Sequence, residues 1–230
     1  MKAVRTCRRL VRACLGGLLP ARRFLVRGPR AGDSVCLTFD DGPHPEHTPV
    51  LLDMLRREGV PATFFVIGRR AAEFPELVRR MVDEGHAVGH HTYSHSDPAE
   101  TTARKMAAEI NQTSNVLVRA IGFSPTLFRP PHGRLTPAML WRLWRIGMTV
   151  VLWNVDLRDF ACGSADELRD RLRAHDPLSG DVYLFHDDRP HAHSALPEFI
   201  ARVRARGLTF TTLTEWVGRP AGTFPERSIA

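Results

Sequence analysis

Short apolar runs alternate with amphipathic stretches from residue 33 onward, and this alternation most limits the folds open to the chain. The apolar runs predict strands at residues 35–39, 62–67, 86–90, 126–129, 148–155, 181–185 and 208–212. Repeated strand and helix units predict a parallel sheet covered by helices. About seven strands in one domain suit a barrel better than an open sheet. We therefore expect an α/β fold, namely a distorted (β/α)7 barrel in a single domain.

Capping and breaking residues mark the ends of the helices between these strands. Proline and capping side chains favour the start of a helix, and glycine favours the position just after its end. The predicted helices run from Thr48 to Gly59, from Pro75 to Gly85, from Met106 to Gly122, from Thr136 to Gly147, from Ser164 through Leu172, and from Pro197 to Gly207.

Charge divides the chain into a basic arm and a near-neutral body. Residues 1–32 hold nine Lys or Arg and no Asp or Glu, whereas the remainder holds 23 basic and 25 acidic residues, a net charge of −2. Such a body, without a basic aromatic platform, argues against a nucleic-acid partner. We assign residues 1–32 to a basic N-terminal arm, residues 33–218 to the domain and residues 219–230 to a tail, and we expect a monomer.

The arm has three interpretations. Its apolar residues, among them Val4, Val11 and Leu18, recur at helical spacing with arginines largely on another face, so it can make peripheral contact with an anionic membrane surface. Its short apolar stretch at residues 13–19 is a poorly formed match to a cleavable secretory signal. Alternatively, it is a helix or a disordered arm packed on the domain. No segment approaches the length of a membrane span. The sequence leaves the location open between the cytoplasm, the membrane surface and the cell envelope.

The residues that are candidates for catalysis or metal binding follow the predicted strands at their C-terminal ends. In a parallel α/β barrel, active sites are built on that face, so residues far apart in sequence converge there. Solvated loop charges would instead be spread over both ends of the strands. In chain order, the candidates are Asp40, Asp41, His91, Arg129, Asp156, Asp159 and His186.

His91 and His95 are spaced as metal ligands. Residues at i and i+4 on one helical turn share a face, so both imidazoles can bind one ion. A His pair alone is more often structural, but an Asp at a neighbouring strand end supplies a third ligand. Two nitrogens, one carboxylate and an open position for water make a catalytic zinc site.

Five motifs appear along the chain in one order: TFDDGP at residues 38–43, HTYSH at 91–95, RPPHG at 129–133, DLRDF at 156–160 and LFH at 184–186. From about residue 35 to residue 216 the chain resembles the polysaccharide deacetylases that share the NodB homology domain, which is carbohydrate esterase family 4.

The resemblance implies roles for the motif residues. Asp40 would be the general base, and His186 the general acid, oriented by Asp159. Arg129 joins them as a catalytic residue through the third motif. One divalent metal ion would be bound by Asp41, His91 and His95. The ion would be zinc, with cobalt or another divalent ion as the alternative.

The chain departs from the family pattern in the expected substrate groove. His132 stands where the family usually has Tyr or Phe, and Phe160 stands where it has Trp. The resemblance implies that the backbone N–H of His132 binds the oxyanion of the tetrahedral intermediate. We expect the groove to include His132, Pro131, Phe160, Trp153 and Leu184.

The predicted activity is metal-dependent hydrolysis of the N-acetyl group on N-acetylglucosamine-type sugars. Chitooligosaccharides, peptidoglycan or a related polysaccharide would be the substrate, and acetate would be released. One alternative is a related hydrolase of a non-peptide C–N bond, on a lipid-linked sugar or another amide. An alternative of another class is a catalytically inactive carbohydrate-binding module.

Overall fold

The structure, a computed structural model, describes residues 17–218 and contains one parallel sheet. The strand order is β1-β6-β5-β4-β3-β2-β8-β7, and β9 pairs with β2. The end strands β1 and β7 do not pair with each other within the described residues, so the barrel is open on one side. The strands are β1 (Phe24–Leu25), β2 (Ser34–Asp40), β3 (Thr63–Val66), β4 (Ala87–His90), β5 (Leu127–Phe128), β6 (Thr149–Val151), β7 (Val155–Asp156), β8 (Val182–His186) and β9 (Thr209–Phe210).

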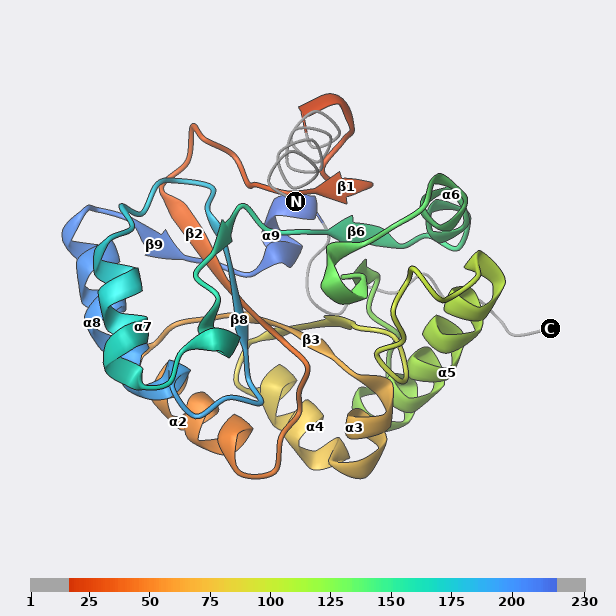
Figure 1. Cartoon of the computed structure of the whole chain (residues 1–230), viewed down its shortest axis with the longest axis horizontal. Helices are drawn as coiled ribbons and strands as arrows, with labels where there is room; N and C mark the ends of the chain where they lie inside the picture. The colour runs from red at the N-terminus through yellow and green to blue at the C-terminus, as the bar shows by residue number, and fades with distance from the viewer. Residues whose placement is uncertain (1–16, 219–230) are drawn as a thin grey trace.

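Helices surround this sheet, with α7 and α8 on one side and α5 and α6 on the other (Figure 1). The helices are α2 (His47–Glu58), α3 (Gly68–Glu73), α4 (Pro75–Asp83), α5 (Ala103–Ile121), α6 (Pro137–Arg145), α7 (Ala165–Arg173), α8 (Ala192–Ala205) and α9 (Leu213–Val217). The expected single-domain α/β barrel is confirmed. No helix of residues 17–218 is long and apolar enough to cross a membrane.

Several predicted helix ends are confirmed by their capping contacts. The side chain of Thr136 accepts a hydrogen bond from the backbone N–H of Met139, at 3.2 Å, and begins α6. Ser164 does the same for α7 through the N–H of Glu167, also at 3.2 Å. Gly59 ends α2 in the left-handed conformation that favours glycine.

Strand β1 was not predicted, because its two residues lie in the segment interpreted as an arm. Phe24 and Leu25 are buried and pair with Val150 and Val151 of β6. Two residues are too few to show an alternating pattern. Residues 1–16 of the expected arm and residues 219–230 of the expected tail lie outside the described residues.

Two other boundaries differ from the predictions. The predicted strand at 148–155 is two strands, β6 and β7, separated by residues 152–154. The prediction that Pro197 begins a helix is wrong, because α8 starts at Ala192 and includes Pro197. Proline removes one backbone hydrogen bond inside a helix. The buried side chains of Ala195 and Leu196 extend the packed face of α8 and offset that loss.

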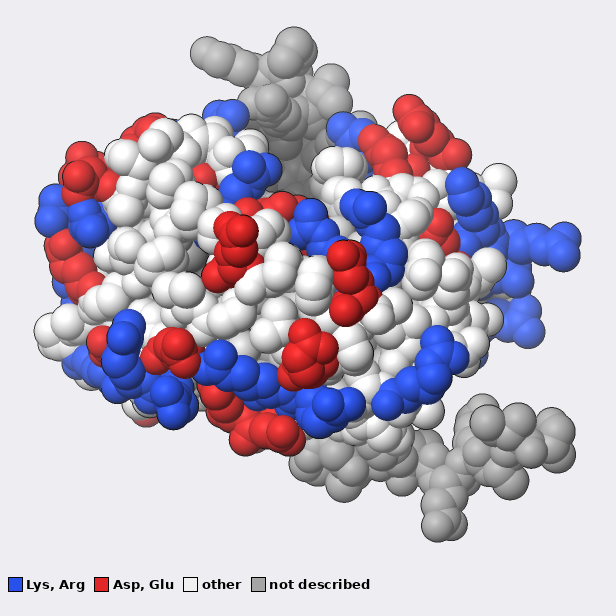
Figure 2. Space-filling model, turned by 90° about the horizontal axis from the view of Figure 1, so that it is seen from below, with Lys and Arg blue, Asp and Glu red and all other residues white. Residues whose placement is uncertain are grey.

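Acidic and basic side chains are interspersed over the face shown in Figure 2, as expected for a near-neutral body.

Inside the barrel, stacked aromatic rings connect three strands. The Phe39 ring of β2 lies 5.1 Å from the Phe64 ring of β3 and 5.7 Å from the Phe185 ring of β8, measured between centroids. This packing fixes the three strands whose ends carry or adjoin the candidate site.

The buried carboxylate of Asp181 connects several segments at the N-terminal end of the parallel strands. Asp181 precedes β8, and its pKa is lowered because hydrogen bonds from His175, Asn154 and Leu178, together with the charge of Arg27, outweigh the opposing effect of burial. Its contacts are Asn154 Nδ2 at 2.8 Å, Leu178 N–H at 3.0 Å, Arg27 Nη2 at 3.0 Å and His175 Nε2 at 3.3 Å.

We expect Asp181→Ala to lower the free energy of unfolding by about 2–4 kcal/mol, because it leaves buried donors without their acceptor. A lowered folded-state pKa stabilises the protein above the unfolded pKa, so the difference from wild type should shrink as the pH falls through the acid range. Denaturant unfolding at neutral and acid pH measures both effects. Asp176→Ala removes an exposed carboxylate paired with Arg206 and is the control. An equal loss in the two variants would contradict the prediction.

Candidate active site

The strand register brings the predicted site residues to one edge of the sheet. Asp40, the last residue of β2, pairs with His186, the last residue of β8. Strands β4 and β5 end one residue before His91 and Arg129. The loops that follow these strands therefore begin side by side at the C-terminal edge, as the sequence predicted.

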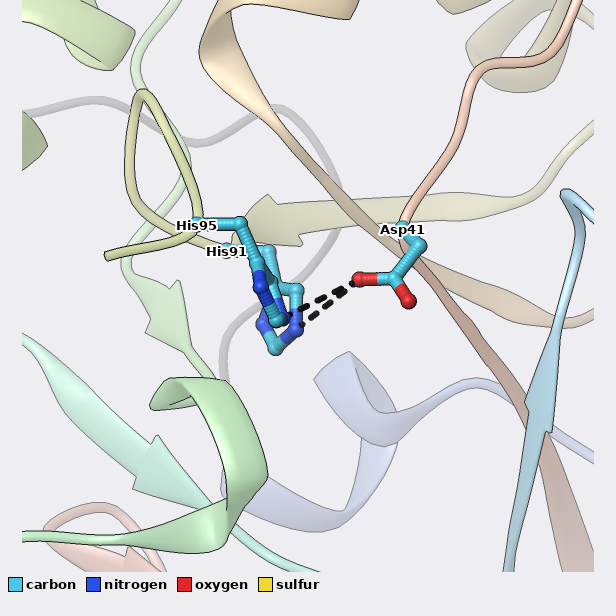
Figure 3. A group of neighbouring side chains, drawn as sticks. All are labelled: Asp41, His91 and His95. Atoms are coloured by element: carbon cyan, nitrogen blue, oxygen red, sulfur yellow. Dashed lines mark ion pairs between the residues drawn. The ribbon is translucent and has the colours of Figure 1, made fainter. Parts of the chain in front are cut away.

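Asp41, His91 and His95 form the cluster expected for a metal site (Figure 3). Their potential ligand atoms all lie within 4.8 Å of one another. Asp41 Oδ1 lies 3.5 Å from His91 Nε2 and 3.3 Å from His95 Nε2. It is buried and has no hydrogen-bond partner within the described residues. A buried carboxylate oxygen left unpaired between two imidazole nitrogens fits a divalent ion.

Contacts around the cluster orient its members. His91 Nδ1 lies 2.8 Å from the carbonyl oxygen of Arg129, which leaves Nε2 to face Asp41. The Arg70 guanidinium donates to the Asp41 carbonyl oxygen at 2.7 Å. Burial alone would raise the pKa of Asp41, but the positive charges of His91, His95, His186 and Arg70 outweigh it and lower that pKa.

The two histidines do not share a helical turn, so that part of the prediction is wrong. Residues 91–95 form a loop in which Thr92 and His95 adopt left-handed backbone conformations, with φ of 63° and 60°. The N–H of His95 donates to the Thr92 hydroxyl at 3.0 Å and closes the loop. A turned loop, rather than helical periodicity, aims both imidazoles at Asp41.

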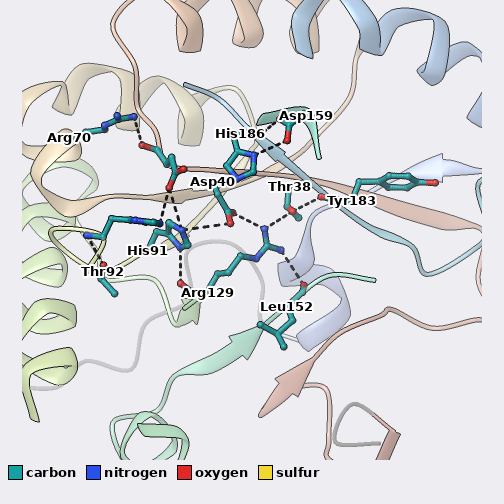
Figure 4. A network of polar contacts seen from close by, with 12 residues as sticks. Thr38, Asp40, Arg70, His91, Thr92, Arg129, Leu152, Asp159, Tyr183 and His186 are labelled. Carbon is teal, nitrogen blue, oxygen red and sulfur yellow. Dashed lines mark hydrogen bonds and ion pairs between the residues drawn. The ribbon is translucent and has the colours of Figure 1, made fainter. Parts of the chain in front are cut away.

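Arg129 and Asp40 form a buried ion pair beside this cluster (Figure 4). Arg129 is 0% exposed, and its Nη1 donates to Asp40 Oδ1 and to the Thr38 hydroxyl, each at 2.7 Å. Asp40 Oδ2 points toward the other side and lies 3.8 Å from His91 Nε2. One oxygen of Asp40 is therefore held by Arg129, and the other faces the metal cluster.

His186 is held by Asp159 on the opposite side of the site (Figure 4). Asp159 Oδ1 lies 2.8 Å from His186 Nδ1, and Asp159 Oδ2 accepts the backbone N–H of His186 at 2.7 Å. Burial disfavours a charged imidazole, but the hydrogen bond and charge of Asp159, with the charges of Asp40 and Asp41, raise the pKa of His186 to about 9.

The predicted groove residues lie around these groups to different extents. Phe160 is exposed, and its ring meets His186 edge to face, with centroids 5.6 Å apart. His132 is exposed and left-handed, and its ring lies 5.1 Å from that of His95. The Trp153 ring lies 5.5 Å from the Arg129 guanidinium. The remaining two groove residues, Pro131 and Leu184, are buried.

The family model described as polysaccharide deacetylase matches residues 27–151, more than half of the chain. The chain belongs to the polysaccharide deacetylase family. Among its relatives, a peptidoglycan-N-acetylglucosamine deacetylase from Bacillus cereus is 36% identical over 195 residues, which are 83% of this chain and 70% of the relative. A chitooligosaccharide deacetylase from Sinorhizobium fredii is 38% identical over 171 residues, covering 73% and 79%.

Solved structures share the deacetylase fold. A peptidoglycan N-acetylglucosamine deacetylase superposes with a TM-score of 0.82 at 33% identity, covering 86% of this chain and 94% of its own. A pseudoenzyme of the family from Bacillus anthracis superposes with a TM-score of 0.79 at 25% identity, covering 87% and 70%. The chain spans only 42% of a longer Listeria monocytogenes deacetylase.

The family is metal-dependent, and the Asp41, His91 and His95 cluster fits that property.

Sequence reasoning missed Glu109 of α5, which holds the loop that carries His91 and His95 of the candidate metal cluster. Its Oε2 accepts the N–H groups of Tyr93 and Ser94 at 3.0 and 2.9 Å. Its Oε1 accepts the hydroxyls of Ser94 and Ser96 at 2.7 and 3.1 Å. The three residues that donate these four hydrogen bonds lie between His91 and His95 or just after His95. A single acidic residue on an amphipathic helix gave no signal of this role.

Asp187 is the second residue whose role the sequence did not reveal. It is buried rather than solvated, and it accepts a hydrogen bond from the Thr48 hydroxyl at 2.8 Å. A Cβ atom added to Gly42 would lie 1.8 Å from its Oδ2. Gly42 is therefore required by the close approach of the Asp187 carboxyl to the turn after Asp41.

We expect Glu109→Gln to weaken metal binding by roughly tenfold or more, because the amide accepts through only one of its two terminal atoms and leaves donors of the loop unpaired. Competition between the metal-free protein and a chromogenic zinc chelator measures the affinity. Glu76→Gln changes an exposed glutamate of α4 and is the matched control. Equal affinities for Glu109→Gln and wild type would show that the loop does not need this carboxylate.

Proposed function

We propose that this protein hydrolyses the N-acetyl group of N-acetylglucosamine-type sugars in an oligomer or polymer, and releases acetate. The observation that carries the proposal is the unpaired Asp41 Oδ1 between His91 and His95, with Asp40 and His186 at the same sheet edge. Relatives named as peptidoglycan and chitooligosaccharide deacetylases support this substrate class.

Asp41, His91 and His95 would hold one divalent ion, which we propose to be zinc because its usual ligands are imidazole nitrogens and carboxylate oxygens. When bound, such an ion acts as a Lewis acid on the acetamide carbonyl and favours ionisation of a water molecule. The short contacts of His91 Nδ1 and of the Asp41 carbonyl oxygen keep the ligands oriented before the ion binds.

Two protein groups would move the protons. Asp40, fixed through one oxygen by Arg129, takes a proton from the attacking water with the other as the new C–O bond forms. The backbone N–H of His132 would stabilise the oxyanion. His186, held at Nδ1 by Asp159, then donates a proton from Nε2 to the sugar nitrogen as the C–N bond breaks. The products are acetate and a free amine.

A catalytically inactive carbohydrate-binding protein is the second candidate, because a pseudoenzyme of the family has the same fold. This chain retains both carboxylates and all three histidines of the proposed site: Asp40, Asp41, His91, His95 and His186. These residues favour an enzyme. A lipid-linked acylated sugar is the alternative substrate, and an assay that compares it with chitooligosaccharides and peptidoglycan fragments separates the two.

We expect Asp40→Asn to reduce acetate release by roughly 10²–10⁴-fold, because an amide cannot accept the proton of the attacking water. Zinc-loaded wild type and variant are compared on a panel of N-acetylated sugars, with Asp166→Asn, an exposed residue of α7, as the matched control. Full activity of Asp40→Asn would remove the proposed base. Sugar binding by the wild type without acetate release from any substrate would favour the binding protein.

We expect a bell-shaped pH–rate profile whose alkaline limb lies near or below pH 9. His186 acts as an acid only when protonated, so activity falls as the pH rises through its pKa of about 9. A bound divalent ion adds positive charge nearby and lowers this limit. Asp159→Asn removes the partner that raises the His186 pKa, so its alkaline limb should move to lower pH. A single-limbed wild-type profile, or an unmoved limb in Asp159→Asn, would contradict this division of roles.

A further inference from the structure

Charged residues are distributed unevenly along the domain, although the net charge from residue 33 onward is only −2. Residues 101–155, which include α5 and α6, hold seven Lys or Arg and one acidic residue, Glu109. All other residues from 33 onward hold 16 basic and 24 acidic residues. The Glu109 carboxylate is hydrogen-bonded to the loop of the metal site. Of the seven basic residues, Arg129 is buried against Asp40 and Arg134 pairs with Asp97. The exposed basic residues on the side of the domain formed by α5 and α6 are therefore Arg104, Lys105, Arg119, Arg142 and Arg145.

Helix α6 exposes large apolar side chains on this basic side. Its buried face packs through Met139 and Leu143, whereas Trp141 is 57% exposed and Ile146, just after the helix, is 42% exposed. The Arg145 guanidinium lies 4.8 Å from the Trp141 ring centroid. Among residues 17–218, no acidic side chain pairs with Arg142 or Arg145. Trp141 and Arg145 thus share the solvent-facing side of α6, and the exposed Arg142 and Ile146 flank it on the side of α5.

The segment before β1 contacts α6. Leu19 packs against the cluster that contains Met139 and Leu143 of α6. The Arg23 guanidinium donates to the Trp144 carbonyl oxygen, and the Trp144 indole donates to the Arg23 carbonyl oxygen, each at 3.0 Å. Leu18, next to the packed Leu19, is 82% exposed. The segment therefore adds another exposed apolar residue and further arginines to the surface.

We propose that this surface binds an anionic lipid bilayer, independently of the reaction proposed above. The α6 surface consists of Leu18, Arg22, Arg23, Trp141, Arg142, Arg145 and Ile146. At a bilayer, the apolar side chains enter the boundary between headgroups and acyl chains, and the arginines contact the headgroup phosphates. Residues 1–16 add five Lys or Arg and no acidic residue, which strengthens the attraction to an anionic surface.

A lipid surface explains the α6 surface better than a soluble polyanion does. A polyanion without apolar groups, such as dextran sulfate, is bound through its charge and would leave Leu18, Trp141 and Ile146 in water. A bilayer takes up both kinds of side chain at once, because its interface offers phosphate groups beside hydrocarbon. Tryptophan in particular favours the headgroup level of membranes.

The test is co-sedimentation of the full chain with vesicles of phosphatidylcholine alone and with vesicles that contain about one third phosphatidylglycerol. We expect wild type to bind the anionic vesicles more tightly. The variant Arg142→Glu/Arg145→Glu should lose at least about tenfold in partition coefficient, since each basic residue near the surface contributes several-fold. Arg56→Glu/Arg57→Glu makes the same charge change on exposed residues of α2 and should lose much less.

Trp141→Ser tests the apolar contribution, and we expect it to bind anionic vesicles several-fold more weakly while its binding to dextran sulfate stays unchanged. Thermal unfolding of each variant verifies that the fold is retained. The proposal is wrong if wild type does not bind anionic vesicles. It is equally wrong if both double variants lose the same affinity, or if Trp141→Ser binds vesicles as wild type does, since the surface would then be a general polyanion site.

Discussion

The buried ion pair between Arg129 and Asp40 is the interaction on which the candidate site depends. A guanidinium with no exposure to water is costly unless a carboxylate and hydrogen-bond acceptors replace its hydration. Asp40, the Thr38 hydroxyl and the Leu152 carbonyl oxygen supply these contacts, and the Phe65 ring lies 4.2 Å from the guanidinium carbon. Arg129 therefore connects the interior of the sheet to the proposed base. Loss of this residue would disturb packing and chemistry together.

Backbone strain is concentrated around the same site. The described non-glycine residues with positive φ all lie in the motif segments, and they are Asp41, Thr92, His95, His132 and Arg158. Left-handed backbone costs roughly 1–2 kcal/mol for such residues. Specific contacts hold these conformations, for example the Arg70 bond to the Asp41 carbonyl oxygen and the hydrogen bonds from the 93–96 loop to Glu109. Strain of this kind is typical of functional sites, where the surrounding structure fixes an otherwise rare conformation.

Sequence reasoning was sufficient where a local pattern determines the structure. Helix caps at Thr136 and Ser164 depend on neighbouring residues, and the gathering of chemical groups at one sheet edge follows from parallel topology. It was insufficient where distant residues decide. The 91–95 loop is shaped by Thr92 and by Glu109 of a later helix, and β1 exists because β6 offers it a partner. Such contacts leave no periodic trace in the sequence.

The close approach of Gly42 to Asp187 limits the order in which this sequence can change. A side chain at position 42 would collide with a carboxyl that is itself bonded to Thr48 and enclosed by the fold. A side chain at position 42 requires that Asp187 be shortened or moved, whereas Asp187 can be shortened while Gly42 stays, so their effects on stability are coupled rather than additive. Descendants that lose Gly42 must first shorten or relocate Asp187. Substitutions in the turn after the proposed metal ligand Asp41 therefore depend on the residue that follows the proposed acid, although 145 positions separate Gly42 from Asp187 along the chain.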